Sequence, residues 1–170
     1  MPLNALMNFS NSTKGESRLV GFEGWIEIQG WDWDVEADTS WTKGGGASVG
    51  KPNPGKMNWE HYYDSSSPQI LRFICTGTMF DTVTMKMFKS TGAATQTGGG
   101  NNFFTMDMEG CFITKVANSA TEDGNVLQKV EMVFKKVTIT YKPQGPGSGK
   151  EGTLGGGIPY SWDIPKGSVG

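Results

Sequence analysis

Hydrophobic and polar residues alternate along much of the chain, which is the pattern of strands with one buried face. In segment 25–35 the alternation places Ile26 and Ile28 on one face, whereas Trp31 and Trp33, which follow Gln29-Gly30, fall on the other. One extra residue in a strand reverses the faces of all following side chains, and glycine tolerates the backbone angles that this requires. The segment therefore predicts a strand with a β-bulge at Gln29-Gly30.

A second reversal of faces occurs between residues 130 and 141. Val130 and Phe134 share one parity, Val137 and Tyr141 share the other, and the change falls at Lys135-Lys136. Two long strands that each change face midway predict bent strands that wrap a barrel or a tightly coiled sandwich, because a flat sheet would not require the change. The expected fold class is all-β.

Further strands are expected at residues 57–63, 81–88 and 103–116, and a terminal strand carries Tyr160, Trp162 and Ile164. We expect the methionine-rich strand 81–88 to lie either near an adjacent subunit or in the core, and we favour the core, because methionine adapts to irregular contacts. Strand 103–116 alternates well, but Cys111 and Ile113 fall on its polar side. This end of the strand is therefore expected to be covered on both faces.

One short helix is predicted at residues 68–76. Ser67 can cap its free N–H groups, Pro68 suits the first helical position, and Gly77 suits a left-handed C-terminal position. The apolar stripe of the helix includes Ile70 and Phe73, so the helix is expected to pack against the wall of the barrel.

Residues 36–55 show no hydrophobic period and form an unusually long connection. Long connections of this kind are generally functional or disordered. We interpret the segment as an extended loop that serves as an interaction arm, because Trp41 and Val49 give it apolar anchors. The predicted subunit-interface residues are Trp41, Lys43, Val49, Lys51 and Pro52.

Composition restricts the domain organisation and the partners. A chain of 170 residues suits one domain, residues 1–170, and 25 glycines and 8 prolines suit an all-β protein with many turns. The formal net charge is −2, so no basic surface suggests nucleic acid as a partner. A run of about 18 apolar residues is absent, so we expect neither a transmembrane helix nor membrane anchoring.

The N-terminal residues and the cysteines suggest where the protein is made. Residues 1–9 lack a positively charged region followed by an apolar run, so no signal peptide is expected and synthesis is placed in the cytoplasm. Cys75 and Cys111 are too few for a disulfide framework. Both are expected to be reduced and buried as small hydrophobic side chains.

Candidate catalytic or metal-binding chemistry is sparse. His61 is the only histidine and is expected to be packed, no nucleophile motif is present, and no cofactor is implied. Asp32, Asp34 and Glu36 lie on one side of a strand, where they form either a solvated face, which we favour, or a weak calcium site. We therefore predict no catalytic and no metal-binding residue. Six tryptophans leave a carbohydrate-binding β-sandwich module as the alternative class.

Several motifs, in the order in which they occur along the chain, resemble those of the haemolysin-coregulated protein (Hcp) family, which forms the tube of the type VI secretion system. The resemblance extends over nearly the whole chain, and its motifs lie near residues 14–17, 24–35, 64–68, 134–141 and 159–164. The residues that carry it most clearly are Gly15, Glu16, Ser17, Trp25, Glu27, Trp31, Trp33, Ser67, Pro68, Tyr160 and Trp162.

The resemblance implies a specific architecture and role. It implies a small two-sheet β-barrel with one flanking helix and a long arm, similar to phage tail tube proteins. Subunits of this family form homo-hexameric rings that stack into a tube inside a contractile sheath, capped by a VgrG-type spike. Small effector proteins travel in the lumen, and the ring also acts as their carrier and chaperone. The tube protein is secreted by the type VI system, and it is not an enzyme.

Overall fold

The computed structural model describes residues 5–10, 13–42, 45–89, 102–143 and 156–170, except for the side chains of residues 41 and 42. The described residues form twelve strands and one helix, which confirms the all-β class with a single short helix. In chain order these elements are β1 (Ala5–Phe9), β2 (Ile26–Ile28), β3 (Gly30–Asp32), β4 (Val35–Thr42), β5 (Gly46–Pro54), β6 (Met57–Tyr62), α1 (Ser67–Thr76), β7 (Met79–Phe88), β8 (Asn102–Ala120), β9 (Val126–Val133), β10 (Lys136–Tyr141), β11 (Ile158–Asp163) and β12 (Ser168–Val169).

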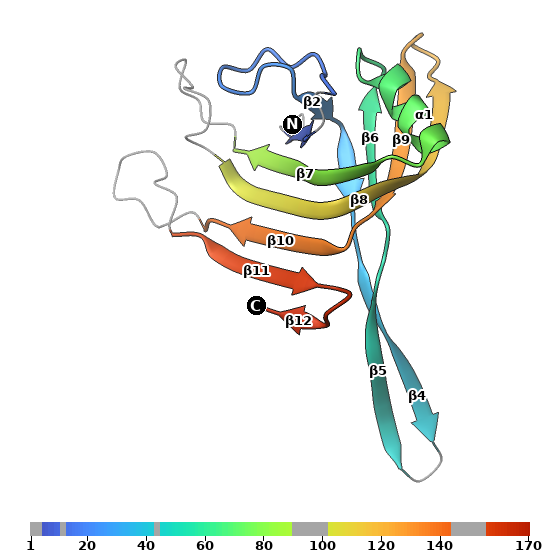
Figure 1. Cartoon of the computed structure of the whole chain (residues 1–170), viewed down its shortest axis with the longest axis vertical. Helices are drawn as coiled ribbons and strands as arrows, with labels where there is room; N and C mark the ends of the chain where they lie inside the picture. Colours follow the sequence, from blue (N-terminus) through green and yellow to red (C-terminus); the bar gives the residue numbers. More distant parts are fainter. Residues whose placement is uncertain (1–4, 11–12, 43–44, 90–101, 144–155) are drawn as a thin grey trace.

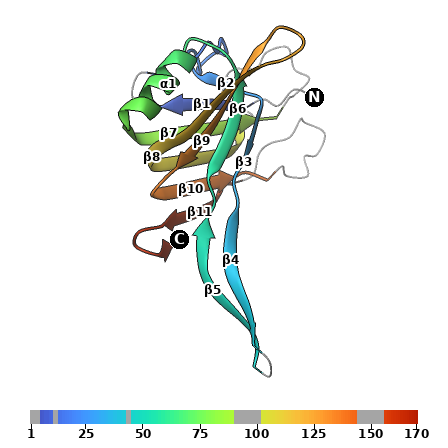
Figure 2. The same ribbon diagram turned by 90° about the vertical axis from the view of Figure 1, so that its right-hand side faces the viewer.

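Ten of these strands form one sheet, and β4 and β5 form a second sheet of their own (Figures 1 and 2). The large sheet follows the order β12-β11-β10-β8-β7-β1-β2, and β8 also pairs with β9, which leads through β6 to β3. All of these pairings are antiparallel. Because β3 directly follows β2 in the chain, the path returns toward its start. Hydrogen-bonded closure into a barrel stays a prediction.

Strand β8 changes its buried face at Gly110. Met106 and Met108 are buried before it, and Cys111 and Ile113 are buried after it, with Phe112 only half-buried. Gly110 has a φ of 64°, a left-handed conformation that favours glycine and that lets the strand bend. The expectation that both faces are covered here is therefore wrong, because the strand exchanges one buried face for the other.

The other two predicted reversals of faces occur at breaks between strands. Ile26 and Ile28 are buried in β2, whereas Trp31 and Trp33 pack against the core from the far side of a bend at Gln29. β2 pairs with β1 and β3 pairs with β6, so the chain changes its partner strand at the bend. Similarly, the expected strand 130–141 is divided into β9 and β10.

Helix α1 begins one residue earlier than predicted and ends at Thr76, followed by Gly77 at the C-cap as expected. Its N-cap is Ser66, whose side chain makes no capping hydrogen bond, so the capping role expected for Ser67 is wrong. Gly77 is left-handed, with a φ of 62°. Ile70 is fully buried and Cys111 is buried in the sheet, but Cys75 is exposed, because it lies beside the apolar stripe of the helix; its predicted burial is wrong.

Methionine fills much of the core. Six methionines are fully buried, and they are Met7, Met57, Met85, Met106, Met108 and Met132. Met85 lies in the methionine-rich segment 81–88, for which a core position was favoured. Unbranched thioether side chains adapt to the irregular space inside a strongly bent sheet. Within the described part of the chain, no helix is long and apolar enough to cross a membrane.

Candidate assembly surface

The two-stranded sheet β4–β5 projects from the body as a long arm (Figures 1 and 2). All nine residues of β5 are exposed, and so are residues 35–40 of β4. The predicted aperiodic loop is therefore wrong, since the segment is a paired hairpin with an irregularity between Ala37 and Thr39. Neither face of this hairpin is buried, which explains why its sequence lacks a hydrophobic period.

The base of the arm is fixed by Trp33 and Gly55. The indole Nε1 of Trp33 donates a hydrogen bond to Gly55 O at 3.1 Å, and the Trp33 ring lies 5.5 Å from the ring of Phe134 in the core. Gly55 N in turn donates to Asp34 O at 2.8 Å. A Cβ on Gly55 would lie 2.9 Å from the backbone atom Asp34 O, which is closer than Cβ atoms normally approach, so glycine is favoured here.

The predicted interface residues all belong to this arm. Val49 is 70% exposed, and Lys51 and Pro52 are exposed on the same strand. The backbone of Trp41 pairs with Ala47, whereas the side chain of Trp41 and the whole of Lys43 lie outside the described residues. An isolated two-stranded hairpin is marginally stable in water, so this arm offers backbone edges and uncovered apolar groups to a partner.

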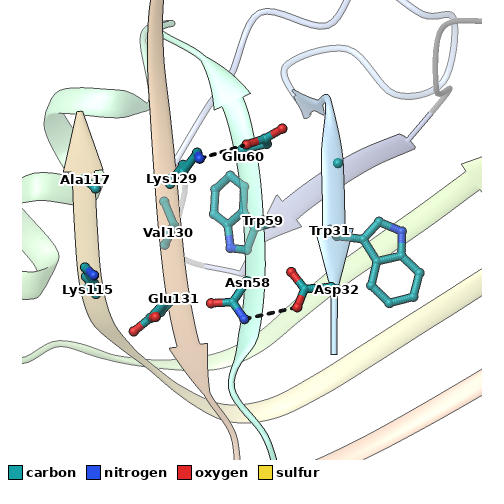
Figure 3. A pocket seen from close by; sticks show the side chains of 11 residues that line it. Trp31, Asp32, Asn58, Trp59, Glu60, Lys115, Ala117, Lys129, Val130 and Glu131 are labelled. Atoms are coloured by element: carbon teal, nitrogen blue, oxygen red, sulfur yellow. Dashed lines mark hydrogen bonds and ion pairs between the residues drawn. The ribbon is translucent and has the colours of Figure 1, made fainter. Parts of the chain in front are cut away.

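A shallow cleft opens on the outer face of β3, β6, β9 and the second half of β8 (Figure 3). It encloses about 390 Å³, and its rim carries acidic and basic side chains in similar numbers. Asn58 donates to Asp32 at 3.4 Å, and the Lys129 ammonium lies 3.9 Å from Glu60. The cleft thus has a mixed polar and apolar lining, with three carboxylates and two lysine ammonium groups.

The three carboxylates of segment 32–36 are not brought together as a metal site. Asp32, Asp34 and Glu36 are all exposed, Asp32 on the cleft and Glu36 on the arm. Among the described residues, no group of three or more potential ligand side chains could hold a metal ion. This arrangement agrees with the solvated strand face that we favoured.

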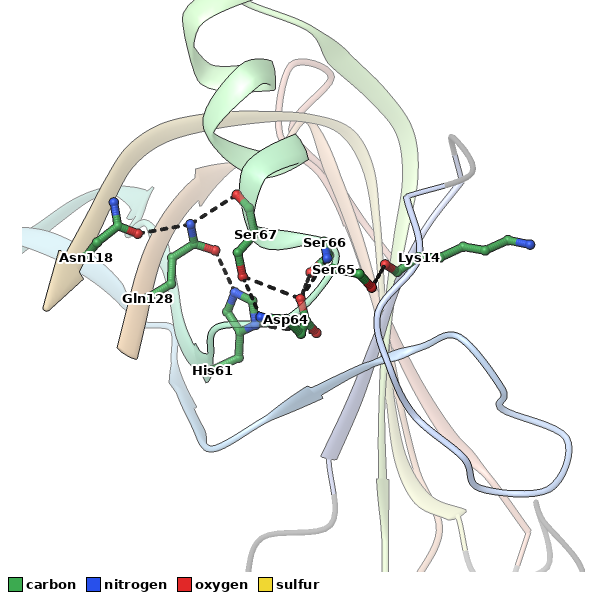
Figure 4. A network of polar contacts seen from close by, with 8 residues as sticks. All are labelled: Lys14, His61, Asp64, Ser65, Ser66, Ser67, Asn118 and Gln128. Atoms are coloured by element: carbon green, nitrogen blue, oxygen red, sulfur yellow. Dashed lines mark hydrogen bonds and ion pairs between the residues drawn. The ribbon is translucent and has the colours of Figure 1, made fainter. Parts of the chain in front are cut away.

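His61 is fully buried in a polar network between β6, β9 and the start of α1 (Figure 4). Its Nε2 lies 2.7 Å from Gln128 Oε1. The Gln128 amide nitrogen donates to Ser67 O at 3.3 Å and to Asn118 Oδ1 at 3.2 Å. Because the amide nitrogen faces these two acceptors, its oxygen faces the imidazole, and His61 Nε2 must be the donor.

Asp64 organises the turn before the helix (Figure 4). Its Oδ1 accepts hydrogen bonds from Ser66 N at 2.8 Å, from the Ser66 hydroxyl and from the Ser67 hydroxyl. Burial would raise the pKa of Asp64, but contacts with His61 and Ser66 outweigh it, so the net pKa lies below its ordinary value. Both serine hydroxyls are directed to Asp64, so His61 has no activated nucleophile in this network.

Most of the residues that carry the family resemblance have structural tasks. A Cβ on Gly15 would lie 2.6 Å from Trp25 O, and Ser17, which is buried, donates its N–H to the same oxygen at 3.0 Å. Ser67 is buried at the start of α1, where Pro68 occupies an exposed position in the first turn. Glu16 and Glu27, by contrast, are exposed.

The tryptophans mainly pack inside the molecule. Trp31 stacks on Phe104 with ring centroids 5.4 Å apart, and its Nε1 donates to Met87 Sδ at 3.3 Å. Trp59 and Trp162 are buried, and Trp25, Trp31 and Trp33 are half-buried. Tyr160, which lies on β11 with Trp162, is also half-buried. Five of the six tryptophans therefore provide no exposed platform on which a sugar ring could stack.

Comparisons with known proteins place this fold. The family model described as "Type VI secretion system effector, Hcp" matches residues 6–141. The structure resembles that of a type six secretion system protein with a TM-score of 0.83 at 20% identity, covering 99% of each chain. It resembles Hcp1 from Salmonella typhimurium with a TM-score of 0.74 at 17% identity and 99% coverage of each chain.

A third solved structure is a tryptophan double mutant of Hcp1 from E. coli EAEC 042, with a TM-score of 0.74 at 21% identity, covering 96% of this chain and 99% of that one. No match is found among curated proteins. The likeness to these structures concerns the fold, whereas the family model spans well over half of the sequence. The chain belongs to the Hcp family of the type VI secretion system.

Proposed function

We propose that this protein is a structural subunit of the type VI inner tube, in which six copies close into a ring and rings stack into a tube. The observation that carries the proposal is the complete exposure of β5 in a hairpin that projects from the body. A head-to-tail contact that closes after a fixed rotation gives a ring, and it requires an element that reaches from one copy to the next. The arm has this reach.

The proposal includes the partners that such a tube needs. A contractile sheath surrounds it, a VgrG-type spike caps it, and small effector proteins occupy its lumen. The protein is made in the cytoplasm and leaves the cell through the type VI apparatus. It performs no bond chemistry, which is supported by the fully buried position of His61 and by the two serine hydroxyls near it that face Asp64.

Deletion of residues 42–51 tests the role of the arm. The full chain should elute as a ring of about 110 kDa, six times the 18.4 kDa of one chain, and negative-stain images should show annuli. The deletion should give single chains with an unchanged far-ultraviolet circular dichroism spectrum of the body. Asp123→Ala, in the exposed turn between β8 and β9, is the matched control and should leave rings intact. Rings that persist after the deletion would refute the role of the arm.

A further inference from the structure

A small acidic notch lies at the end of the molecule that is opposite the arm. It encloses about 120 Å³ and is lined by Glu16, Glu27, Gln29, Tyr62, Tyr63 and Asp64. Strand β6 runs away from the arm and ends at Tyr62, which places the notch at the far end of the body (Figure 1). The arm and the notch therefore lie at opposite ends of the long axis.

The carboxylates of the notch are left without cationic partners by their own chain. Glu16 and Glu27 are exposed and make neither an ion pair nor a hydrogen bond with any described residue. Behind Asp64 lies His61, fully buried, with its Nδ1 3.8 Å from Asp64 Oδ2 and no hydrogen-bond partner among the described residues. A distance of 3.8 Å exceeds that of a hydrogen bond, so Oδ2 is free to accept one from another group.

The walls of the notch are aromatic. Tyr62 is 47% exposed and Tyr63 is 42% exposed, so both side chains are accessible to a partner. A cation that sits between tyrosine rings and carboxylates gains from both the ring faces and the negative charge. The chemistry of the notch therefore suits an ammonium or guanidinium group on a side chain.

Several of the basic residues that the structure describes are engaged within their own chain. Lys56 and Lys136 lie within 4 Å of carboxylates, and Lys86 lies over the Phe22 and Trp25 rings. Lys51, on the arm, is exposed and has no ion pair with any described residue.

Lys51 cannot reach the notch of its own chain. Strands β5 and β6 run in the same direction, so the eleven steps from Lys51 to Tyr62 extend over about 36 Å at roughly 3.3 Å per step. The side chain of lysine is far shorter than this distance. A second copy, shifted along the long axis, would bring its Lys51 to this end of the molecule.

We propose that the notch formed by Glu16, Glu27 and Asp64 binds the Lys51 ammonium of the next copy in a stack. The inference rests on the proposed tube, and it names the two surfaces through which consecutive copies meet head to tail. The arm of one copy and the notch of the next copy form this axial contact, which is separate from the contact that the arm makes with the neighbouring subunit of its own ring. Because each copy carries both, the contact repeats without limit along one axis, as a tube requires.

Cysteine pairing between separately made chains tests the contact. In a Cys75→Ser background, one chain carries Glu27→Cys and a second, tagged chain carries Lys51→Cys; the two are mixed and oxidised. A disulfide-linked heterodimer should appear on a non-reducing gel. The matched control uses Asp123→Cys in place of Glu27→Cys. Asp123 is an exposed residue in the β8–β9 turn, which lies at the same end of the molecule (Figure 1). The yield of cross-linked heterodimer should be at least tenfold lower in this control.

Charge exchange provides the second measurement. Glu27→Lys and Lys51→Glu should each reduce stacking of rings in sedimentation at low salt, and the double variant should restore it. Equal cross-linking in the control pair, or no restoration in the double variant, overturns the notch as the site that binds Lys51 while rings remain. If the unmodified chain sediments only as single chains, the proposed tube itself fails, so the two failures are distinguishable.

Discussion

Replacement of Gly15 by alanine tests how the loop before β2 is held. A Cβ at this position would lie 2.6 Å from Trp25 O and 2.7 Å from Ile26 Cα, and both of these are backbone atoms. An ordinary contact begins near 3.4 Å, so the two segments would have to separate by about 0.8 Å. They are tied by hydrogen bonds from Gly15 N to Gly24 O at 2.7 Å and from Ser17 N to Trp25 O at 3.0 Å.

The cost of this separation follows from the contacts. Overpacking of a tight site typically costs about 1–3 kcal/mol, and weakening the two hydrogen bonds adds about 0.5–1.5 kcal/mol each if they are lost. We expect Gly15→Ala to lower the free energy of unfolding by about 2–4 kcal/mol. The backbone on the other side cannot yield easily, because Ile26 is fully buried and pairs with Met7 of β1.

Urea unfolding followed by tryptophan fluorescence measures this change. The control is Gly156→Ala, since a Cβ there would have no neighbour within 4 Å, and it should shift the free energy by less than about 0.5 kcal/mol. An unchanged slope with denaturant would show that the compactness of both states is preserved. If Gly15→Ala unfolds at the same urea concentration as the control, the steric argument is wrong.

Three further predictions concern other sites. Since the pKa of Asp64 is lowered in the folded state, its stabilisation is present above about pH 4 and is lost as pH falls below this; Asp64→Asn should flatten that acid dependence in unfolding curves. In the native protein, Ellman's reagent should modify Cys75 rapidly and Cys111 only on unfolding, because burial raises the pKa of Cys111 to about 12. Trp33→Phe should keep the core contact but lose about 1 kcal/mol at the base of the arm, which hydrogen exchange would report as roughly fivefold faster opening of β4 and β5.

The sequence reveals which side chains face the core but not which strands pair. The change of parity between the isoleucines 26 and 28 and the tryptophans 31 and 33 correctly locates a change of buried face near Gln29. Its cause is an exchange of partner from β1 to β6, and β6 begins almost thirty residues later in the chain. Periodicity is a local property, whereas this exchange depends on long-range pairing. A bulge within one continuous strand was the local interpretation of the same pattern.

The arm illustrates the opposite difficulty. Val35 and Val49 are exposed and Pro52 and Pro54 interrupt the donors of β5, so nothing in this segment resembles a half-buried strand. Its strands are recognised only through backbone pairing, such as that of Ala37 with Pro52, which leaves no trace in hydropathy. Its length, its lack of a hydrophobic period and its apolar residues Trp41 and Val49 were the signals that could identify it as an arm, but they did not predict its secondary structure.

Order in the arm and assembly of the protein are energetically linked. Fixing one residue costs about 1–2 kcal/mol of backbone entropy, while a backbone hydrogen bond returns about 0.5–1.5 kcal/mol net. In β5, where every residue is exposed, no apolar burial offsets the difference. The hydrogen bond between Trp33 and Gly55 stabilises only the base, and in the proposed tube the outer arm gains its remaining stability from a surface on another copy. The contact that orders the arm is then the same contact that joins the copies, and neither can be strengthened without the other.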